Sequence, residues 1–189
     1  SVIYNGFSGS RYSLTMNEVS DFNGDGQKGN SLLYIPTEAE MDNMNFVDYT
    51  DQKTGKLIMS AADSRKAFTE WVNNDDYAKN HRGQYAERNS NLSNWEHEID
   101  LHLAQTIYNA QGLGKLEFTF DIINFANMLN KKWGASYSSA YNLSPLTVVS
   151  LSTDENGNRN PGYAFNNAKI NKSDISSRWH AQVGIRLTF

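Results

Sequence analysis

Hydrophobic and polar residues alternate with a period of two in three stretches of the chain, 95–107, 116–122 and 178–189. This pattern is typical of β-strands that bury one face. In the third stretch the apolar positions are Trp179, Ala181, Val183, Ile185, Leu187 and Phe189, and the polar ones are Arg178, His180, Gln182, Arg186 and Thr188. We therefore predict three amphipathic strands.

Weaker strand patterns lie at 2–16, 146–151 and 163–165, so about six strands are expected in all. The connections between them differ greatly in length. Residues 154–158 contain an Asn-Gly pair and predict a tight turn, and a short Gly-containing turn lies between 107 and 116. By contrast, the segment 17–94 is long, and loops of that length are usually functional or carry their own structure.

Part of this long segment has a helical pattern. Ser60 and Asp63 suit the start of a helix, where a side-chain oxygen caps the first amides and an acidic group meets the positive end of the dipole. Phe68, Trp71 and Val72 then follow at helical spacing. The sequence predicts one short amphipathic helix over 61–73.

The composition changes this picture mainly by exclusion. The chain has 10 Tyr, 9 Phe, 4 Trp and only 3 Pro, which favours β-structure, and no Cys, which excludes disulfides and thiolate chemistry. A net charge of −4 argues against a nucleic-acid binder. No apolar run is long enough for a transmembrane helix. The chain does not begin with Met, and we expect it to be part of a longer protein.

Short connections that alternate with long ones, between strands with one apolar face, are the arrangement of transmembrane β-barrels. An aromatic last residue after alternating apolar positions resembles the assembly signal of outer-membrane barrels, here Trp179, Val183, Ile185, Leu187 and Phe189. The alternative is a self-contained soluble, secreted β-domain that binds carbohydrate or another ligand through exposed aromatic side chains.

Seven motifs make the barrel interpretation more specific. They follow one another along the chain at 4–13, 21–26, 30–36, 82–89, 121–130, 132–134 and 182–186. The chain resembles the C-terminal part of TonB-dependent outer-membrane receptors, in the Oar-like branch whose members carry a carboxypeptidase-regulatory-like domain. Two positions depart from that pattern: Ser31 stands where the family often has Asp, and Asn94 where it often has Pro.

The resemblance implies an all-β fold, the last six or so antiparallel strands of a transmembrane barrel of about 22 strands. Residues 17–94 would be a long extracellular loop containing the short helix, and 95–189 the last strands with the assembly signal. The plug and N-terminal domains would lie outside this chain. The implied location is the outer membrane of a Gram-negative bacterium. The implied partners are outer-membrane lipid, the plug, the rest of the barrel, the TonB energy-transducing complex and the barrel-assembly machinery.

Two polar clusters suggest chemistry, each with a simpler alternative. Asp21, Asn23 and Asp25 open like a calcium loop, but Leu32 occupies the position of the bidentate carboxylate, so a weak Ca²⁺ site competes with an ordinary turn. The second cluster shares one strand face and is expected in a barrel lumen rather than at a metal or catalytic site. Its members are Glu96, Glu98, Asp100 and His102.

Aromatic residues provide the remaining candidates. In the long segment, Trp71, Tyr77 and Tyr85 are candidate ligand contacts, with packing inside the segment as the alternative. Elsewhere a carbohydrate or peptide site competes with a membrane-interface girdle, which we favour for the three tryptophans. These residues are Trp95, Trp133, Trp179, Tyr137 and Tyr141. The sequence contains neither a nucleophile elbow nor a phosphate-binding glycine loop, so we expect that the protein is not an enzyme.

Overall fold

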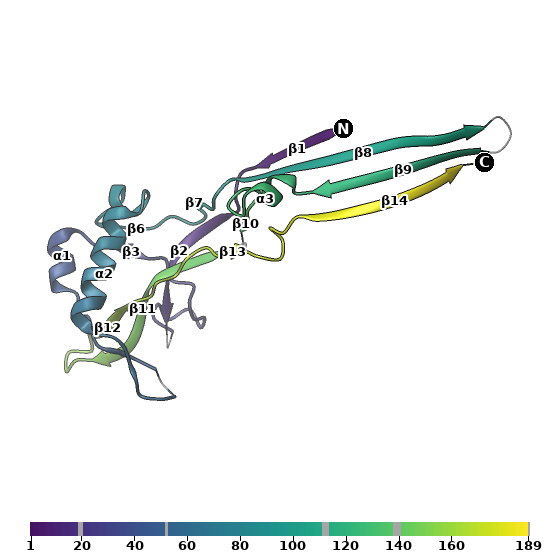
Figure 1. Cartoon of the computed structure of the whole chain (residues 1–189). Coiled ribbons are helices and arrows are strands. Elements are labelled where there is room, and N and C mark those ends of the chain that lie inside the picture. The colour runs from purple at the N-terminus through teal and green to yellow at the C-terminus, as the bar shows by residue number, and fades with distance from the viewer. Residues whose placement is uncertain (19–20, 52, 111–113, 138–140, 189) are drawn as a thin grey trace. The chain divides into compact units, whose positions relative to one another are not determined.

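The computed structural model describes residues 1–18, 21–51, 53–110, 114–137 and 141–188, and shows a mainly β-structured chain (Figure 1). The expected all-β-like character is confirmed. The chain divides into two compact units. Unit 1 comprises residues 1–10, 93–139 and 170–189, and unit 2 comprises 11–92 and 140–169.

Unit 1 contains a four-stranded antiparallel sheet in the order β1-β8-β9-β14. The three amphipathic strands predicted from the sequence are β8, β9 and β14. Within the described residues, β1 and β14 are the edges of this sheet. The strands span Val2–Phe7 (β1), Glu96–Ala110 (β8), Gly114–Ile123 (β9) and His180–Thr188 (β14).

The chain between β9 and β14 begins with a short helix, α3 (Phe125–Leu129), and later pairs β10 (Ser136–Tyr137) with β13 (Lys172–Ser173). Asn124 organises these segments. Its backbone is left-handed, with φ of 55°, and its Nδ2 donates to the carbonyls of Gly134 at 2.7 Å and Ser177 at 3.0 Å. One side chain therefore joins both ends of the connection.

Unit 2 is built on a second sheet in the order β12-β11-β2-β7. Its β2 and β11 pair in parallel, so the expectation of antiparallel strands throughout is wrong for this pair. Both faces of β2 are covered, since five consecutive residues from Tyr12 to Met16 are buried. The strands span Arg11–Glu18 (β2), Asn91–Leu92 (β7), Asn142–Thr153 (β11) and Arg159–Phe165 (β12).

The segment expected as a long loop instead contributes much of the core of unit 2. Leu33, Ile35, Phe68 and Val72 are completely buried, together with Leu14 of β2. Burial of this kind stabilises a folded body by removing apolar surface from water. The segment contains β3 (Tyr34–Ile35), α1 (Glu38–Asn43), β4 (Tyr49–Thr50), β5 (Leu57–Met59), α2 (Ala61–Asn74), the 3₁₀ helix η1 (Ala78–Asn80) and β6 (Gln84–Tyr85).

Two expected boundaries therefore change. The strand expected over 2–16 is divided into β1 and β2, which belong to different units. Its interruption lies near Gly9, where a side-chain β-carbon would stand 2.2 Å from the carbonyl oxygen of Ser93. The expected boundary between 17–94 and 95–189 also differs from the boundary between the two units, because residues 141–169 belong to unit 2.

The helix predicted over 61–73 is confirmed as α2. The hydroxyl of Ser60 accepts from the Asp63 amide at 3.1 Å, and Phe68 and Val72 face the core. Arg65 of α2 holds α1, since its Nη2 donates to the Met44 carbonyl at 2.7 Å. The guanidinium thus satisfies a carbonyl at the end of α1 that the helix itself leaves without a partner.

Candidate functional site

The strand register of unit 1 aligns apolar side chains into rows across the sheet. Leu103 pairs with Phe120, and Phe120 pairs with Val183. Side chains that pair across strands point to the same face. This side also carries Gly6, His97, Gln105 and Gly114. Its apolar residues form what we call the apolar face: Val2, Tyr4, Ile99, Leu101, Leu103, Leu116, Phe118, Phe120, Ile122, Ala181, Val183, Ile185 and Leu187.

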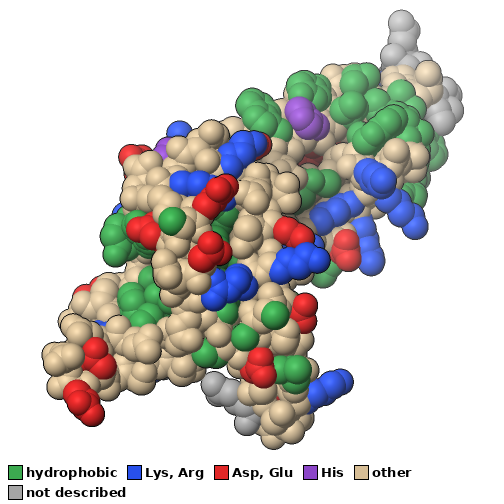
Figure 2. Space-filling model, turned by 90° about the vertical axis from the view of Figure 1, so that its left-hand side faces the viewer, with side chains coloured by type: hydrophobic (Ala, Val, Ile, Leu, Met, Phe, Trp, Pro, Cys, Tyr) green, Lys and Arg blue, Asp and Glu red, His purple; other side chains and the backbone are tan. Residues whose placement is uncertain are grey.

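This face is open to its surroundings. Val183 is 68% exposed, Ile185 66% and Leu103 62%. Figure 2 shows hydrophobic side chains gathered on one flank of the strand region at the upper right, with lysine and arginine side chains on the flank below. Large contiguous apolar patches are rare on monomeric soluble proteins.

The four strands of this sheet differ in length, from 6 residues in β1 to 15 in β8. β9 has 10 residues and β14 has 9. A tilted strand of about 9–11 residues crosses the hydrocarbon core of a bilayer.

The opposite face of the same sheet is mainly polar, although Ile3 and Phe7 also lie on it. Its charged side chains pair with one another, both between strands and along β9. His102 contacts Asp121, and Glu117 lies 2.7 Å from Lys115 Nζ and 3.7 Å from Arg186 Nη1. Charges distributed in this way are expected where a sheet faces water or a polar interior.

The acidic residues that the sequence placed on this face bind the connecting segments. Asp100 accepts from the backbone amide of Asn124 at 2.9 Å, and Glu96 accepts from that of Tyr137 at 2.8 Å. The part of the chain that the structure describes contains no group of three or more His, Cys, Asp or Glu able to hold a metal ion. These side chains thus hold the ends of the sheet in place.

The three candidate girdle residues of unit 1 are all exposed: Trp95 at 61%, Trp133 at 56% and Trp179 at 45%. Trp95, Trp133 and Tyr137 line one small cavity of 280 Å³. Trp179 lines another, of 600 Å³. Tyr141 belongs to unit 2 and is 82% exposed. Trp95 and Trp179 lie next to the ends of β8 and β14, as a girdle requires.

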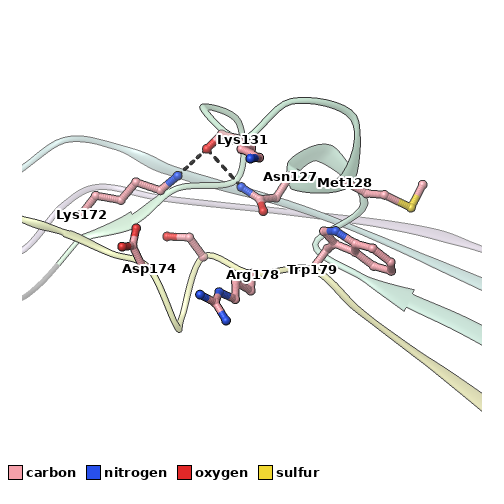
Figure 3. A pocket seen from close by; sticks show the side chains of 8 residues that line it. Asn127, Met128, Lys131, Lys172, Asp174, Arg178 and Trp179 are labelled. Atoms are coloured by element: carbon pink, nitrogen blue, oxygen red, sulfur yellow. Dashed lines mark hydrogen bonds between the residues drawn. The ribbon is translucent and has the colours of Figure 1, made fainter.

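Figure 3 shows the cavity beside Trp179. Asn127 Nδ2 and Lys172 Nζ both donate to the carbonyl of Lys131, which closes one side of the cavity. Its wall combines the apolar Trp179 and Met128 with basic side chains that include Arg178. This is a polar pocket at the end of the strand region.

The candidate calcium loop directs its carboxylates inward. Asp21 accepts from the backbone amides of Gly24 at 2.7 Å and Gly26 at 2.9 Å. Asp25 accepts from Asn30 at 2.7 Å, from the Gln27 amide at 2.8 Å and from Asn23 at 3.0 Å, and these hydrogen bonds lower the pKa of its carboxyl group. The oxygens expected to bind Ca²⁺ are thus used as hydrogen-bond acceptors in a turn. A weak calcium site there remains a prediction.

The three aromatic candidates of the long segment have different environments. Trp71 stacks on the buried Phe68 with ring centroids 6.0 Å apart, and Tyr77 stacks on His81 at 3.9 Å. The hydroxyl of Tyr77 also accepts from the Glu87 amide at 2.9 Å. Both residues therefore hold unit 2 together.

Tyr85, by contrast, is 66% exposed and lines a groove. The groove consists of two cavities, of 450 Å³ and 220 Å³, that share Met16, Phe22 and Tyr85. We call the smaller cavity the apolar end and the larger one the polar end. The apolar end is completed by Tyr34, Pro36, Glu40, Met44, Leu146 and Tyr163, and the polar end by Asn23, Asp25, Asn30, Ser31, Leu32 and Arg88.

The apolar end is held in shape by hydrogen bonds and ring contacts. The rings of Tyr34 and Tyr85 meet edge to face at 5.1 Å, and the Tyr34 hydroxyl donates to Glu40 at 2.9 Å. This bond raises the pKa of Tyr34, because it stabilises the neutral phenol. The Tyr163 pKa is raised as well, here mainly by burial. Both phenols therefore stay neutral at physiological pH.

Sequence reasoning identified Tyr85 but missed its neighbours Phe22, Tyr34, Arg88 and Tyr163. These residues come from four separate segments, and pairing of β3 with β6 brings Tyr34 opposite Tyr85. Alternation of apolar and polar residues identifies a strand only when the strand is long enough to show the period. β3 and β6 have two residues each, so this pattern could not reveal them.

Comparison of the chain with protein-family models, curated proteins and solved structures finds no match. None of the helices in the described ranges is both long enough and apolar enough to cross a membrane.

Proposed function

We propose that this chain forms part of the wall of a TonB-dependent nutrient receptor in the outer membrane of a Gram-negative bacterium. The observation that carries the proposal is the in-register apolar face of unit 1, which is exposed while the opposite face is mainly polar. A sheet of this kind lowers its free energy when lipid covers the apolar side and a polar lumen or plug meets the other.

The connections between the strands indicate which end of the sheet faces the outside of the cell. Only residues 111–113 join β8 to β9, whereas the long segments 8–95 and 124–179 both leave from the end marked by Phe7, Glu96, Ile123 and His180. Bacterial barrels have short turns on the periplasmic side and long loops on the outside. The end with the long segments, which include unit 2, would then be extracellular.

The edges of the sheet indicate what the rest of the barrel supplies. An open sheet cannot stay in lipid, because unpaired backbone groups there are costly. The free sides of β1 and β14 would each pair with a further strand of the complete receptor, and closure would leave no exposed edge. In that receptor, a nutrient binds from outside, and energy transmitted through TonB displaces the plug to admit it.

The experiment is fractionation of cells that produce the native protein with an epitope inserted after Thr54, in the exposed connection between β4 and β5. We expect recovery with the outer membrane, migration on gels that changes with heating, and labelling of the epitope on intact cells. Recovery as a soluble species that needs no detergent would overturn the proposal and favour a secreted ligand-binding β-domain. Membrane recovery with labelling only after lysis would reverse the proposed orientation.

A further inference from the structure

We infer that the groove of unit 2 binds short peptides that end in an apolar residue with a free carboxylate. The inference deepens the proposed function, since it rests on the chain belonging to a receptor and names the class of ligand. The groove itself lies entirely within unit 2, so its binding can be measured apart from any membrane.

The apolar end has the size and lining for one apolar side chain. Its 220 Å³ is below the range of about 300–1,000 Å³ typical of sites that hold a whole drug-sized molecule. Met16, Met44 and Leu146 line it beside three tyrosine rings. Thioethers adapt to irregular apolar groups, and aromatic rings add edge and face contacts. An aromatic or branched aliphatic side chain satisfies this lining.

The carboxylate that lines the apolar end is already occupied by neighbouring donors. Glu40 accepts from Tyr34 through Oε1, and from the Thr37 amide and hydroxyl through Oε2, each at 2.9 Å. Apart from the hydroxyls of Tyr85 and Tyr163, the apolar end therefore has few free partners for the many hydroxyls of a sugar, which would lose hydrogen bonds to water on entry. This argues for a peptide side chain over a carbohydrate.

The polar end contains one guanidinium that pairs with no carboxylate of the chain's described residues. Within the described residues, the guanidinium of Arg88 has no hydrogen bond or ion pair, whereas Asp25 in the same cavity accepts from two asparagine amides and from the Gln27 amide. A free guanidinium binds a carboxylate through two parallel hydrogen bonds. A terminal carboxylate next to an apolar side chain therefore matches both ends of the groove.

The wall of the polar end also contains unsatisfied acceptors. Asn30 Oδ1 and Ser31 Oγ are buried and have no hydrogen-bond partner in the described parts of the chain. Buried polar atoms without a partner are uncommon and carry an energetic cost. A rotation of either side chain that turns its oxygen toward the groove would let it accept from the backbone N–H donors of a peptide, which free fatty acids and other simple carboxylates lack.

The test is calorimetric titration of the full chain in detergent micelles with acetyl-Gly-Gly-Phe, its C-terminal amide, and maltotriose. We expect the free acid to bind with a Kd of about 1 mM or tighter, and the amide about tenfold more weakly because it lacks the carboxylate. Arg88→Gln should weaken the acid to the level of the amide. Tyr85→Ala should weaken acid and amide alike. Arg178→Gln, an exposed arginine of unit 1, is the matched control and should change neither.

Three results would overturn the inference: equal binding of acid and amide, an Arg88→Gln variant that keeps the preference for the acid, or binding of maltotriose alone. Circular dichroism of each variant verifies that it is folded. Because these titrations report only on the groove, their failure leaves the fractionation result standing, and a failed fractionation leaves the peptide titrations standing.

Discussion

Val183 of β14 and Phe120 of β9 lie directly opposite each other on the same face of the sheet, yet they are 68% and 38% exposed. The next apolar pair along these strands, Ile185 and Phe118, repeats the arrangement. Cross-strand pairs of this kind normally stabilise a sheet inside a core. Here they form a surface, and its environment can be tested by changing one side chain at a time.

Ile185→Arg should block insertion of the sheet into a bilayer. If the residue lies near the midplane, the expected penalty is about 2–4 kcal/mol, because a guanidinium must be moved into hydrocarbon. The measurement is the urea dependence of folding into phospholipid vesicles. Gln182→Arg is the control, since residue 182 lies on the polar face and should tolerate the charge. Equal loss in both variants would contradict a lipid-facing apolar surface.

Gly134→Ala should destabilise unit 1. The backbone of Gly134 has φ of 57°, and a β-carbon would stand 1.8 Å from Asn124 Oδ1. Left-handed strain and the loss of the two Asn124 hydrogen bonds predict a decrease of about 3 kcal/mol in the free energy of unfolding, measured by urea titration.

Gly157→Ala separates these two effects. Gly157 also has a positive φ, of 83°, but no atom lies within 4 Å of the added β-carbon. This variant should be destabilised only by the left-handed strain, which lowers the free energy of unfolding by about 1–2 kcal/mol. A Gly134→Ala variant that is no less stable than Gly157→Ala would mean that Asn124 does not fasten the connection.

Phe68→Ala should destabilise unit 2 by about 3–5 kcal/mol, because it leaves a cavity where a completely buried ring packs. The measurement is urea unfolding followed by tryptophan fluorescence, to which Trp71 contributes through its stacking on Phe68. Lys66→Ala, on the exposed side of the same helix, should stay within about 0.5 kcal/mol of the parent chain. Similar values for both would show that α2 is not packed on a core.

Stability should fall in acid partly through Glu40. Hydrogen bonds from the Thr37 amide, the Tyr34 hydroxyl and the Thr37 hydroxyl lower the pKa of this carboxyl group from its ordinary value of 4.5. Its contribution is therefore complete above pH 4.5 and is lost as the pH falls through the lower folded pKa. Glu40→Gln should show a smaller loss of stability on acidification in urea titrations between neutral and acidic pH. If the stability of Glu40→Gln falls with acidification as much as that of the parent chain, the hydrogen bonds to Glu40 do not stabilise the fold.

Much of unit 1 could be predicted because its signals are local. Alternation along β8, β9 and β14 identified the strands, and it also placed Val183, Ile185 and Leu187 on one face. Phe189 lies outside the described residues, so its part in the assembly signal stays a prediction. The turn at 154–158 was recognisable for the same reason, since Gly157 adopts the expected positive φ.

Unit 2 was less predictable because its organisation depends on distant partners. The parallel pairing of β2 with β11 joins Ser13 to Asn142, and β3 meets β6 only through Tyr34 and Tyr85 and their neighbours. Short strands carry too few residues for a periodic signal. The groove was therefore invisible apart from Tyr85.

The sequence by itself determined the amphipathic strands, the capped helix α2 and the tight turn at 154–158, because each depends on the identities of residues that are neighbours along the chain. Only the tertiary structure decided that residues 11–92 and 140–169 share one core, and that Arg88 lies in the same groove as Phe22 and Tyr85. Those contacts form when burial of apolar surface brings remote segments together, and burial depends on where a residue lies in space rather than on its place in the sequence.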